Sequence, residues 1–472
     1  MDLLIKNARI VSPAGITPGA IGIDQGKIVA IAAKETALPP AARTIDAAGQ
    51  HVLPGVCDLH CHPDYLPSPP FAPWDLISRT ESAAAALGGV TTMGFYMKPP
   101  AEKTIAESFG GLKSDWETNA IVDCVFHMSI ASQLRKDEML SVAAKYGITT
   151  FKFPIGYKGP EAAGVGGSGI DDGFVFDGFE RVAQLKAEGW PAMGMIHAEN
   201  PDIIPYLRRK VEHRNDVRAW HDSRPNFVEA ECMNRFVFLA DVAGCPLYIV
   251  HVTIKEGVDI VARARYEGKN VIGETCPQFL THNHDNLPKF MREKPVLVVT
   301  NPPIRAREDN ERLWDGIRDG VVSVVGSDTA PNTVALKGEE IWQKGFMAVG
   351  LGATSGQILP VLLSEGVNRR GLSLEKVVEV TSYNPARIFG IYPQKGNIGI
   401  GADADLVIVD LNKEVDWSAA LSPSNTGWSI YEGWQFKGWP VLTMVRGKIV
   451  AEDGKVVEAG GGRYLPRKRV SQ

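Results

Sequence analysis

The region from about residue 54 to residue 330 alternates short apolar runs with longer stretches in which apolar residues recur at helical spacing. Most of the apolar runs lack a polar face, which is typical of strands covered on both sides. The eight strand candidates are residues 55–62, 91–96, 121–128, 149–153, 192–197, 247–251, 270–274 and 321–328. This α/β alternation predicts a (β/α)8 TIM barrel, although an open doubly wound sheet would produce much the same pattern.

The two ends of the chain have a different pattern. Residues 1–53 contain short β-like runs divided by Pro and Gly turns, and similar runs return at 405–410 and 441–450. The simplest arrangement places both ends in one composite β-sandwich, with the barrel inserted between them. The predicted domains are therefore residues 1–53 and 394–472 for the two parts of the β-sandwich with its C-terminal tail, and residues 54–393 for the barrel.

Composition and charge exclude several classes of partner. Lys and Arg together number 50 against 55 Asp and Glu, and no basic run is long enough to bind a nucleic acid backbone. Apolar runs are interrupted well before the roughly 18 residues that a membrane span needs, and the first residues do not read as a secretion signal. The six cysteines show no C-x-x-C spacing. We therefore expect a cytoplasmic protein with reduced thiols and a small-molecule substrate.

Ionisable residues fall at the ends of the predicted strands. His60 and His62 close the first strand and share a face, because side chains alternate along a strand. A histidine at a strand end often only caps a carbonyl group, so each position alone is weak evidence. In a barrel, however, the C-terminal strand ends converge on one rim, where active sites of this fold are built. The predicted metal ligands at that rim are His60, His62, Lys152, His197, His251 and Asp328.

Lys152 is the unusual member of this set. We expect Phe151 and Phe153 to desolvate its ammonium group and lower its pKa toward the neutral amine. A neutral amine can add carbon dioxide, and the resulting carbamate (N6-carboxylysine) is an anionic ligand able to bridge two cations. Pairing of Lys152 with an acidic side chain is the alternative.

This ligand set predicts metal-assisted hydrolysis. Two divalent ions would polarise a carbonyl group and provide a bridging hydroxide near neutral pH. Asp328 is then placed to take the proton of the hydroxide and pass it to the departing nitrogen. Tyr157, in the loop after Lys152, is expected to donate its phenol to the developing oxyanion.

Three further segments of the sequence stand out. The proline-rich residues 63–73 and the glycine-rich residues 156–173 would follow the first and fourth strands, so each is a candidate pocket wall or lid. Ordinary surface connection is the alternative for both. His282 and His284 repeat the His-x-His spacing, but the surrounding residues predict a solvated loop.

The motifs at these positions resemble those of the amidohydrolase superfamily, and within it the hydantoinases, dihydropyrimidinases and allantoinases. The resemblance runs nearly from end to end of the chain. The matching motifs are PGVCDLHCH (54–62), FK (151–152) with Tyr157, IHAEN (196–200), IVHVT (249–253), GETCPQ (273–278), PPIR (302–305), GSD (326–328), NPAR (384–387), GIGADAD (399–405) and YEGW (431–434) with GWPV (438–441).

The resemblance implies a cyclic amide hydrolase with two divalent metal ions for each chain. Lys152 is similar to the carboxylated lysine of the family, which needs carbon dioxide, and Tyr157 to its oxyanion tyrosine. The metal ions would be zinc, or manganese or cobalt, and the assembly a homotetramer or homodimer.

Three departures from the family pattern concern substrate choice. Thr329 follows Asp328 where the family usually has His, which leaves a small hydroxyl in the pocket. Asn301 stands where hydantoinases usually have Ser. An Asn at this position is more similar to dihydroorotases and some allantoinases. Asp64 occupies the position of a carboxylate-binding Arg in dihydroorotases and would repel such a group. Together with Tyr157, these residues are the predicted substrate contacts.

We therefore predict that the enzyme opens a neutral cyclic amide, imide or ureide ring of the hydantoin or dihydropyrimidine kind. Allantoinase or dihydroorotase activity and hydrolysis of a linear amide are the alternatives. A non-catalytic scaffold relative is a weaker alternative, because all six ligand positions are filled.

Overall fold

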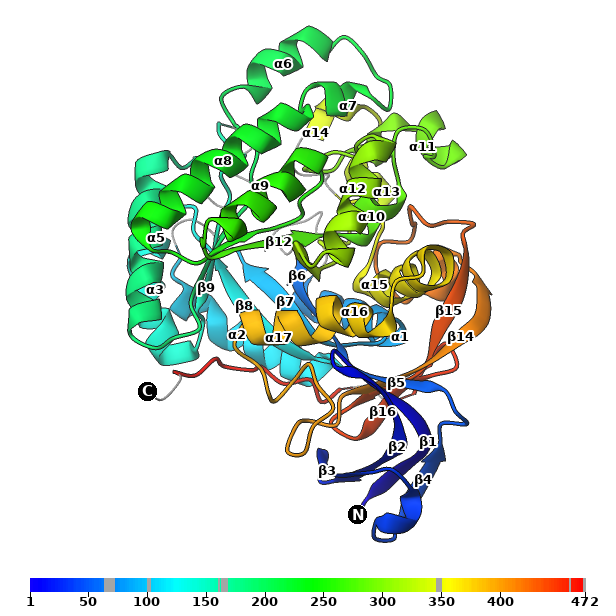
Figure 1. Ribbon diagram of the computed structural model, residues 1–472. Helices are drawn as coiled ribbons and strands as arrows, with labels where there is room; N and C mark the ends of the chain where they lie inside the picture. Colours follow the sequence, from blue (N-terminus) through cyan, green and yellow to red (C-terminus); the bar gives the residue numbers. More distant parts are fainter. Residues whose placement is uncertain are drawn as a thin grey trace.

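The computed structural model describes residues 1–62, 73–99, 103–159, 162, 169–344, 350–457 and 460–469 (Figure 1). Eight parallel strands form one sheet in the order β6 to β13. Their bounds are β6 Val56–Cys61, β7 Val90–Met97, β8 Asp123–Ser129, β9 Thr150–Phe153, β10 Met193–Ile196, β11 Leu247–Ile249, β12 Val271–Thr275 and β13 Val322–Val325. All eight predicted strands are present, and the barrel fold is confirmed.

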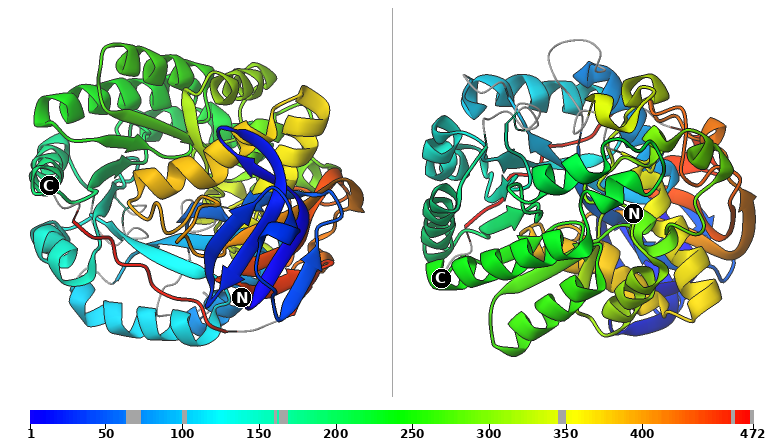
Figure 2. Two further views of the ribbon diagram at one scale, coloured as in Figure 1. Left: turned by 60° about the horizontal axis from the view of Figure 1, so that its bottom comes forward. Right: turned by 90° about the horizontal axis from the view of Figure 1, so that it is seen from above.

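Helices surround the strands, as the view along the barrel in Figure 2 shows. Each barrel strand is followed by at least one helix before the next strand begins. The helices are α1 Trp74–Leu87, α2 Ile105–Asn119, α3 Gln133–Tyr146, α5 Asp172–Ala187, α6 Ile204–Val211, α7 Ala219–Asp222, α8 Asn226–Ala243, α9 Lys255–Tyr266, α10 Pro277–Thr281, α11 Lys289–Glu293, α12 Arg307–Arg318, α13 Val334–Lys337, α14 Ile341–Lys344, α15 Ile358–Val361, α16 Leu374–Val378 and α17 Asn384–Ile388.

Local sequence fixes where several of these helices begin and end. Thr104 and Glu107 form a capping box at the start of α2, in which the Thr104 side chain accepts from the Glu107 amide at 3.2 Å. Asp171 caps α5 by accepting from the Phe174 amide at 2.8 Å. Helix α3 ends at Gly147, whose φ of 66° suits glycine. These residues therefore determine where each of these helices begins or ends, and so the length of its connection to the neighbouring strand.

The interior of the barrel is packed with side chains rather than open. Leu59, Tyr96 and Tyr248 belong to one buried cluster, which Phe389 and Leu465 complete from outside the strands. Leu465 lies on the C-terminal segment, which pairs with the start of β8: its amide donates to the carbonyl oxygen of Cys124 at 2.8 Å. Figure 2 shows this segment, in red, crossing under the strands. The N-terminal end of the barrel is therefore closed, and the opposite rim is left for a site.

The two ends of the chain meet in a second sheet, of nine strands, in the order β17-β16-β15-β14-β5-β1-β2-β3 with β4 beside β1. Pairing of β14 with β5 joins the C-terminal strands to the N-terminal ones, as predicted (Figure 1). The bounds are β1 Leu3–Ser12, β2 Gly15–Asp24, β3 Lys27–Ala32, β4 Arg43–Asp46, β5 His51–Pro54, β14 Leu406–Asp416, β15 Gln435–Val445, β16 Lys448–Glu452 and β17 Lys455–Val456. The domain boundaries at residues 53 and 394 stay a prediction.

A buried ionic cluster joins the barrel to this second sheet. The ammonium of Lys395, fully buried, lies 2.5 Å from Asp123 at the start of β8, 2.6 Å from Asp405 and 3.0 Å from Asp403. Arg446 also contacts the Asp123 carboxylate. Because the cluster connects segments from both units, it fixes how the barrel sits on the β-sheet. No helix among the described residues is long and apolar enough to cross a membrane.

Candidate metal centre and active site

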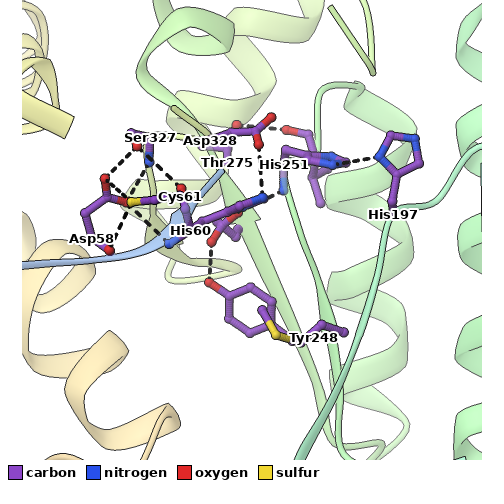
Figure 3. Close-up of polar contacts among 12 residues, drawn as sticks. Asp58, His60, Cys61, His197, Tyr248, His251, Thr275, Ser327 and Asp328 are labelled. Carbon is purple, nitrogen blue, oxygen red and sulfur yellow. Dashed lines mark hydrogen bonds and ion pairs between the residues drawn. The ribbon is translucent and has the colours of Figure 1, made fainter. Parts of the chain in front are cut away.

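Three of the predicted ligands converge closely at the C-terminal rim of the barrel (Figure 3). His60, His251 and Asp328 each offer a ligand atom, and these atoms lie within 4.8 Å of one another. Oδ1 of Asp328 lies 3.1 Å from Nε2 of His60 and 3.1 Å from Nε2 of His62. The carboxylate after β13 therefore reaches both histidines at the end of β6.

The other two histidines form a second pair beside the first. Nδ1 of His197, after β10, lies 2.9 Å from Nε2 of His251, after β11. The opposite nitrogen of His197 contacts the Glu199 carboxylate at 2.8 Å. The rings of His60 and His251 are 5.4 Å apart. His251 is thus the neighbour of both pairs, and the four imidazoles form one continuous group.

Buried Glu274, at the end of β12, orients two of these histidines. Its carboxylate contacts Nδ1 of His60, accepts from the Tyr248 hydroxyl at 2.6 Å and accepts from the backbone amide of His251 at 3.1 Å. Nε2 of His60, on the other side of the ring, faces Asp328 at 3.1 Å from Oδ1. Carboxylate–histidine pairs of this kind are the usual support of metal-binding imidazoles.

The backbone at the site is strained in two places. His251 and Asp328 both have positive φ angles, of 40° and 50°. Residues other than glycine pay about 1–3 kcal/mol for such conformations, which persist where the surrounding structure enforces them. Both of these strained residues are predicted metal ligands. The strain therefore marks the rim as a functional site.

Lys152, at the end of β9, also reaches this rim, as predicted, but its surroundings differ from those that the sequence suggested. Phe153 packs outward against Phe179 of α5, on the opposite face of β9 from Lys152. Inside the barrel, the Lys152 ammonium lies 4.8 Å from the centre of the Tyr96 ring. Burial lowers the pKa of Lys152 to about 7, against the opposing influence of Asp328 and Glu274. The lowered pKa was predicted correctly, whereas the residues held responsible were wrong.

The charges of the site suit divalent cations. Burial lowers the pKa of His62 and of His251 well below the usual value, so both rings are neutral and can offer lone pairs. The pKa of Asp328 is held well below its usual range, because His60 and His62 outweigh the effect of burial. His60 differs, because burial lowers its pKa but the charges of Glu274 and Asp328 outweigh burial and raise the pKa to about 9, so a bound cation would take the place of its proton. Imidazoles with an ionised carboxylate are a donor set that zinc, manganese and cobalt accept. The residues present therefore fit divalent metal ions.

Tyr157 and Asn301 lie together beside the second histidine pair. The ring centres of Tyr157 and His197 are 4.8 Å apart, and both side chains are buried. Burial and the charge of Glu199 raise the pKa of the Tyr157 phenol well above its usual value, while the nearby Asn301 side chain lowers it in part. The phenol is therefore protonated near neutral pH and can donate a hydrogen bond.

Of the remaining predicted substrate contacts, the structure describes Thr329 but not Asp64. The Thr329 hydroxyl is buried and donates to the carbonyl oxygen of Ala353 at 3.1 Å, while the Thr329 carbonyl accepts from the His62 amide at 2.8 Å. Asp64 and the proline-rich loop, apart from Pro73, lie outside the described residues, as does part of the 156–173 loop. Their roles at the pocket stay predictions.

The prediction for His282 and His284 was correct about the loop, since residues 282–286 form loop and turn, but it was wrong about solvation at His282. His282 is fully buried against Tyr431 and Trp434, with ring centres 5.1 and 4.8 Å away, and the His284 ring packs 4.5 Å from His221. The loop-like local sequence gave no sign that C-terminal aromatic residues cover it. Both histidines lie apart from the metal ligands and have a packing role.

Four residues of the site were missed by the sequence reasoning. Glu274 lies at the end of β12 and Glu199 lies three residues after the end of β10, close to the strand ends as the predicted ligands are, and that signal was available. Tyr96, on β7, packs its ring 5.0 Å from His62 and 5.2 Å from His60. Lys98 directly follows β7, and after burial its charge is the largest influence lowering the pKa of His62. An aromatic residue or a lysine near a strand end belongs to no ligand motif, so nothing in the sequence pointed to these two residues.

Comparison with known proteins agrees with this geometry. The Amidohydrolase family profile matches residues 238–450. An L-hydantoinase of Paenarthrobacter aurescens is 34% identical over 99% of this chain and 98% of its own, and a D-hydantoinase of Ralstonia pickettii is 34% identical over the whole of both. The solved L-hydantoinase (dihydropyrimidinase) from Arthrobacter aurescens superposes with a TM-score of 0.87 over 99% of this chain and all of its own, at 34% identity. Allantoinases match as well, among them one of Rubrobacter xylanophilus at 33% identity over 99% of this chain and 98% of its own. The chain therefore belongs to the amidohydrolase family, and within it to the group of hydantoinases, dihydropyrimidinases and allantoinases.

Proposed function

We propose that this protein is a binuclear metal-dependent hydrolase that opens a cyclic amide, imide or ureide ring, in the manner of a hydantoinase or dihydropyrimidinase. The observation that carries the proposal is the meeting of four histidines, Asp328 and Lys152 at one barrel rim. Similarity to both an L- and a D-hydantoinase supports the ring class rather than one stereoisomer.

The positions of the side chains divide the ligands into two groups. His60, His62 and Asp328 would hold one ion, and His197 and His251 the other. Lys152 as a carbamate would serve both. Divalent ions at these positions would polarise the amide carbonyl and make hydroxide available near neutral pH.

The carbamate forms by addition of the neutral Lys152 amine to carbon dioxide, with loss of one proton. A pKa of about 7 leaves roughly half of the Lys152 side chains uncharged at neutral pH, compared with well below 1% at the usual value. Burial of Lys152 therefore prepares the side chain for carboxylation. The Tyr96 ring beside the amine excludes water from this face.

Two residues would move or hold protons during ring opening. Asp328 is ionised and lies at the centre of the site, so it can accept the proton of the attacking water and return it to the departing nitrogen. Tyr157 is protonated and buried beside His197, so it can donate to the oxyanion that develops on the attacked carbonyl.

The substrate-binding side of the pocket involves Asn301, Thr329 and, in the undescribed loop, Asp64. Buried Asn301 lies beside Tyr157 and is suited to hydrogen bond a ring N–H or carbonyl. Thr329 contributes small volume where the family pattern has a histidine, which leaves room for a ring substituent. A neutral ring is the favoured substrate, because Asp64 would repel a carboxylate.

A hydrolysis panel with zinc or manganese added tests the proposal. The panel contains hydantoins, dihydropyrimidines, allantoin, dihydroorotate, succinimides, lactams and linear amides, with the Lys152→Ala variant as the inactive control. We expect turnover confined to one class of neutral ring. Turnover of linear amides alone would overturn the proposed substrate class, and metal-loaded, carboxylated protein without any hydrolysis would favour a scaffold role.

We also infer that the chain acts in the cytoplasm as a homotetramer or homodimer. The family resemblance supports the assembly, and the absence of C-x-x-C spacing among the cysteines supports the compartment. Light scattering of the purified protein would give the assembly size, and a monomeric mass would overturn that part of the proposal.

A further inference from the structure

The barrel has a seam between its first and last strands. Among the described residues, β6 and β13 share no ladder, although every other neighbouring pair in this sheet does. A single bridge between Cys61 and Thr329 and the hydrogen bond from the His62 amide to the Thr329 carbonyl connect the two sides. Asp328, the proposed proton carrier, lies on this weakly paired segment. Its position must therefore be fixed by something other than a regular sheet.

The carboxylate of Asp58 spans the seam (Figure 3). Asp58 is fully buried on β6, and its Oδ1 accepts from the Ser327 backbone amide at 2.9 Å. Its Oδ2 accepts from the Ser327 hydroxyl at 2.5 Å and from the Ser355 hydroxyl. The Cys61 thiol is a further donor, at 3.3 Å. Donors from three separate segments thus meet on one carboxylate.

These bonds bracket Asp328 on both sides. The residue before it, Ser327, is held directly by Asp58 through its amide and its hydroxyl. The residue after it, Thr329, donates its amide to the Ser327 hydroxyl at 3.0 Å, and this hydroxyl in turn donates to Asp58. Asp58 therefore controls the chain immediately before and after the strained φ of Asp328.

We propose that Asp58 is a positioning residue that latches the seam between β6 and β13 and holds Asp328 in the geometry needed for proton transfer. Asp58 is not among the proposed ligands, although the His60 backbone amide lies 3.5 Å from its Oδ1. Asp58 reaches Asp328 through Ser327 and Thr329. Since catalysis is sensitive to shifts of about 1 Å, loss of the latch lowers the rate without altering the parts of the pocket that bind the ring. A role in barrel stability alone would have no such local effect.

The first test measures amide hydrogen exchange in metal-free protein, so it does not depend on the proposed activity. Asp58→Asn keeps the size of the side chain but replaces one accepting oxygen with a donor that faces the two serine hydroxyls. We expect exchange in peptides covering residues 326–330 to accelerate by about tenfold or more, with other barrel peptides unchanged. Unchanged protection at 326–330, or acceleration spread over the whole barrel, would overturn the proposal.

Asp309→Asn is the matched control variant. Asp309 is also a buried carboxylate that accepts three hydrogen bonds, from the amides of Lys255 and Ala306 and from the Asn226 side chain, but on α12, away from the seam. We expect this variant to leave exchange at residues 326–330 as in the wild type. Accelerated exchange there in the control would show that the peptide reports general instability and would overturn the assignment.

The second test is kinetic and rests on the proposed function. With metal content matched to the wild type, Asp58→Asn is expected to lower kcat about tenfold or more while KM stays within about twofold, because ring binding is untouched. Ser327→Ala keeps the amide contact with Asp58 but loses the hydroxyl link to Thr329, so its kcat should lie between those of the wild type and Asp58→Asn. This variant also provides the test if Asp58→Asn does not fold. Equal loss in Asp309→Asn, or an unchanged kcat in both seam variants, would overturn the latch. Accelerated exchange confined to residues 326–330 in Asp58→Asn, together with no turnover by the wild type, would support the positioning role of Asp58 and reject the proposed function.

Discussion

Glu274→Gln gives the sharpest prediction about how the site is built. The Glu274 carboxylate accepts from His60, from the Tyr248 hydroxyl and from the His251 amide, whereas glutamine keeps only one accepting oxygen. At least one buried donor therefore loses its partner, at a cost of about 1–3 kcal/mol. Because glutamine lacks the charged carboxylate that orients His60, we expect the variant to bind metal about 10–100-fold more weakly, which corresponds to about 1.4–2.7 kcal/mol.

Competition with a chromophoric chelator measures this affinity directly, and thermal unfolding of the metal-free proteins reports the change in stability separately. Tyr248→Phe is the matched control, because it removes one donor to Glu274 and leaves the contact with His60 in place. Its metal affinity should stay within about threefold of the wild type. An unchanged affinity in Glu274→Gln would refute the argument that this carboxylate orients His60 for a metal ion.

Two further predictions concern catalysis and stability. Tyr157→Phe should lower kcat by about 2–4 kcal/mol of transition-state stabilisation with a smaller effect on KM, and an unchanged kcat would remove the phenol from the mechanism. Lys395→Met should reduce the free energy of unfolding by about 3–5 kcal/mol at pH 7, because it leaves buried carboxylates without their cation. Burial lowers the pKa of Lys395, but Asp405 and Asp123 outweigh it and raise the pKa, so its stabilisation is fully present below about pH 10 and is lost only above that. Urea unfolding should therefore show the deficit of Lys395→Met at its full size throughout pH 7 to 9, and a deficit that disappears within this range would contradict this account.

The barrel and the convergence of the predicted ligand residues on one rim were predictable, because both depend on periodic patterns. Alternating strands and helices determine the fold class, and parallel strands in a barrel place their C-terminal ends on one rim. A histidine or carboxylate at a strand end is therefore placed by the fold itself. The six predicted ligands could therefore be chosen from the place of each residue at the end of a predicted strand.

Contacts between distant segments could not be read in the same way. Glu274 lies 214 residues from His60, and Asp58 lies 269 residues from Ser327, so no local spacing connects either pair. Burial of His282 depends on aromatic side chains of the C-terminal region. The argument for Lys152 shows a subtler limit, because its sequence neighbour Phe153 packs against α5 while the Lys152 ammonium lies beside Tyr96 inside the barrel.

The central claim is a two-metal site bridged by carboxylated Lys152, and turnover with metal content in Lys152→Ala tests it most directly. Wild-type protein should contain about two transition metal ions for each chain. Lys152→Ala should be inactive, and a short-chain carboxylic acid, which mimics the carbamate, should restore part of both metal binding and turnover. Full activity in Lys152→Ala without added acid, or an active wild-type protein free of metal, would contradict the account.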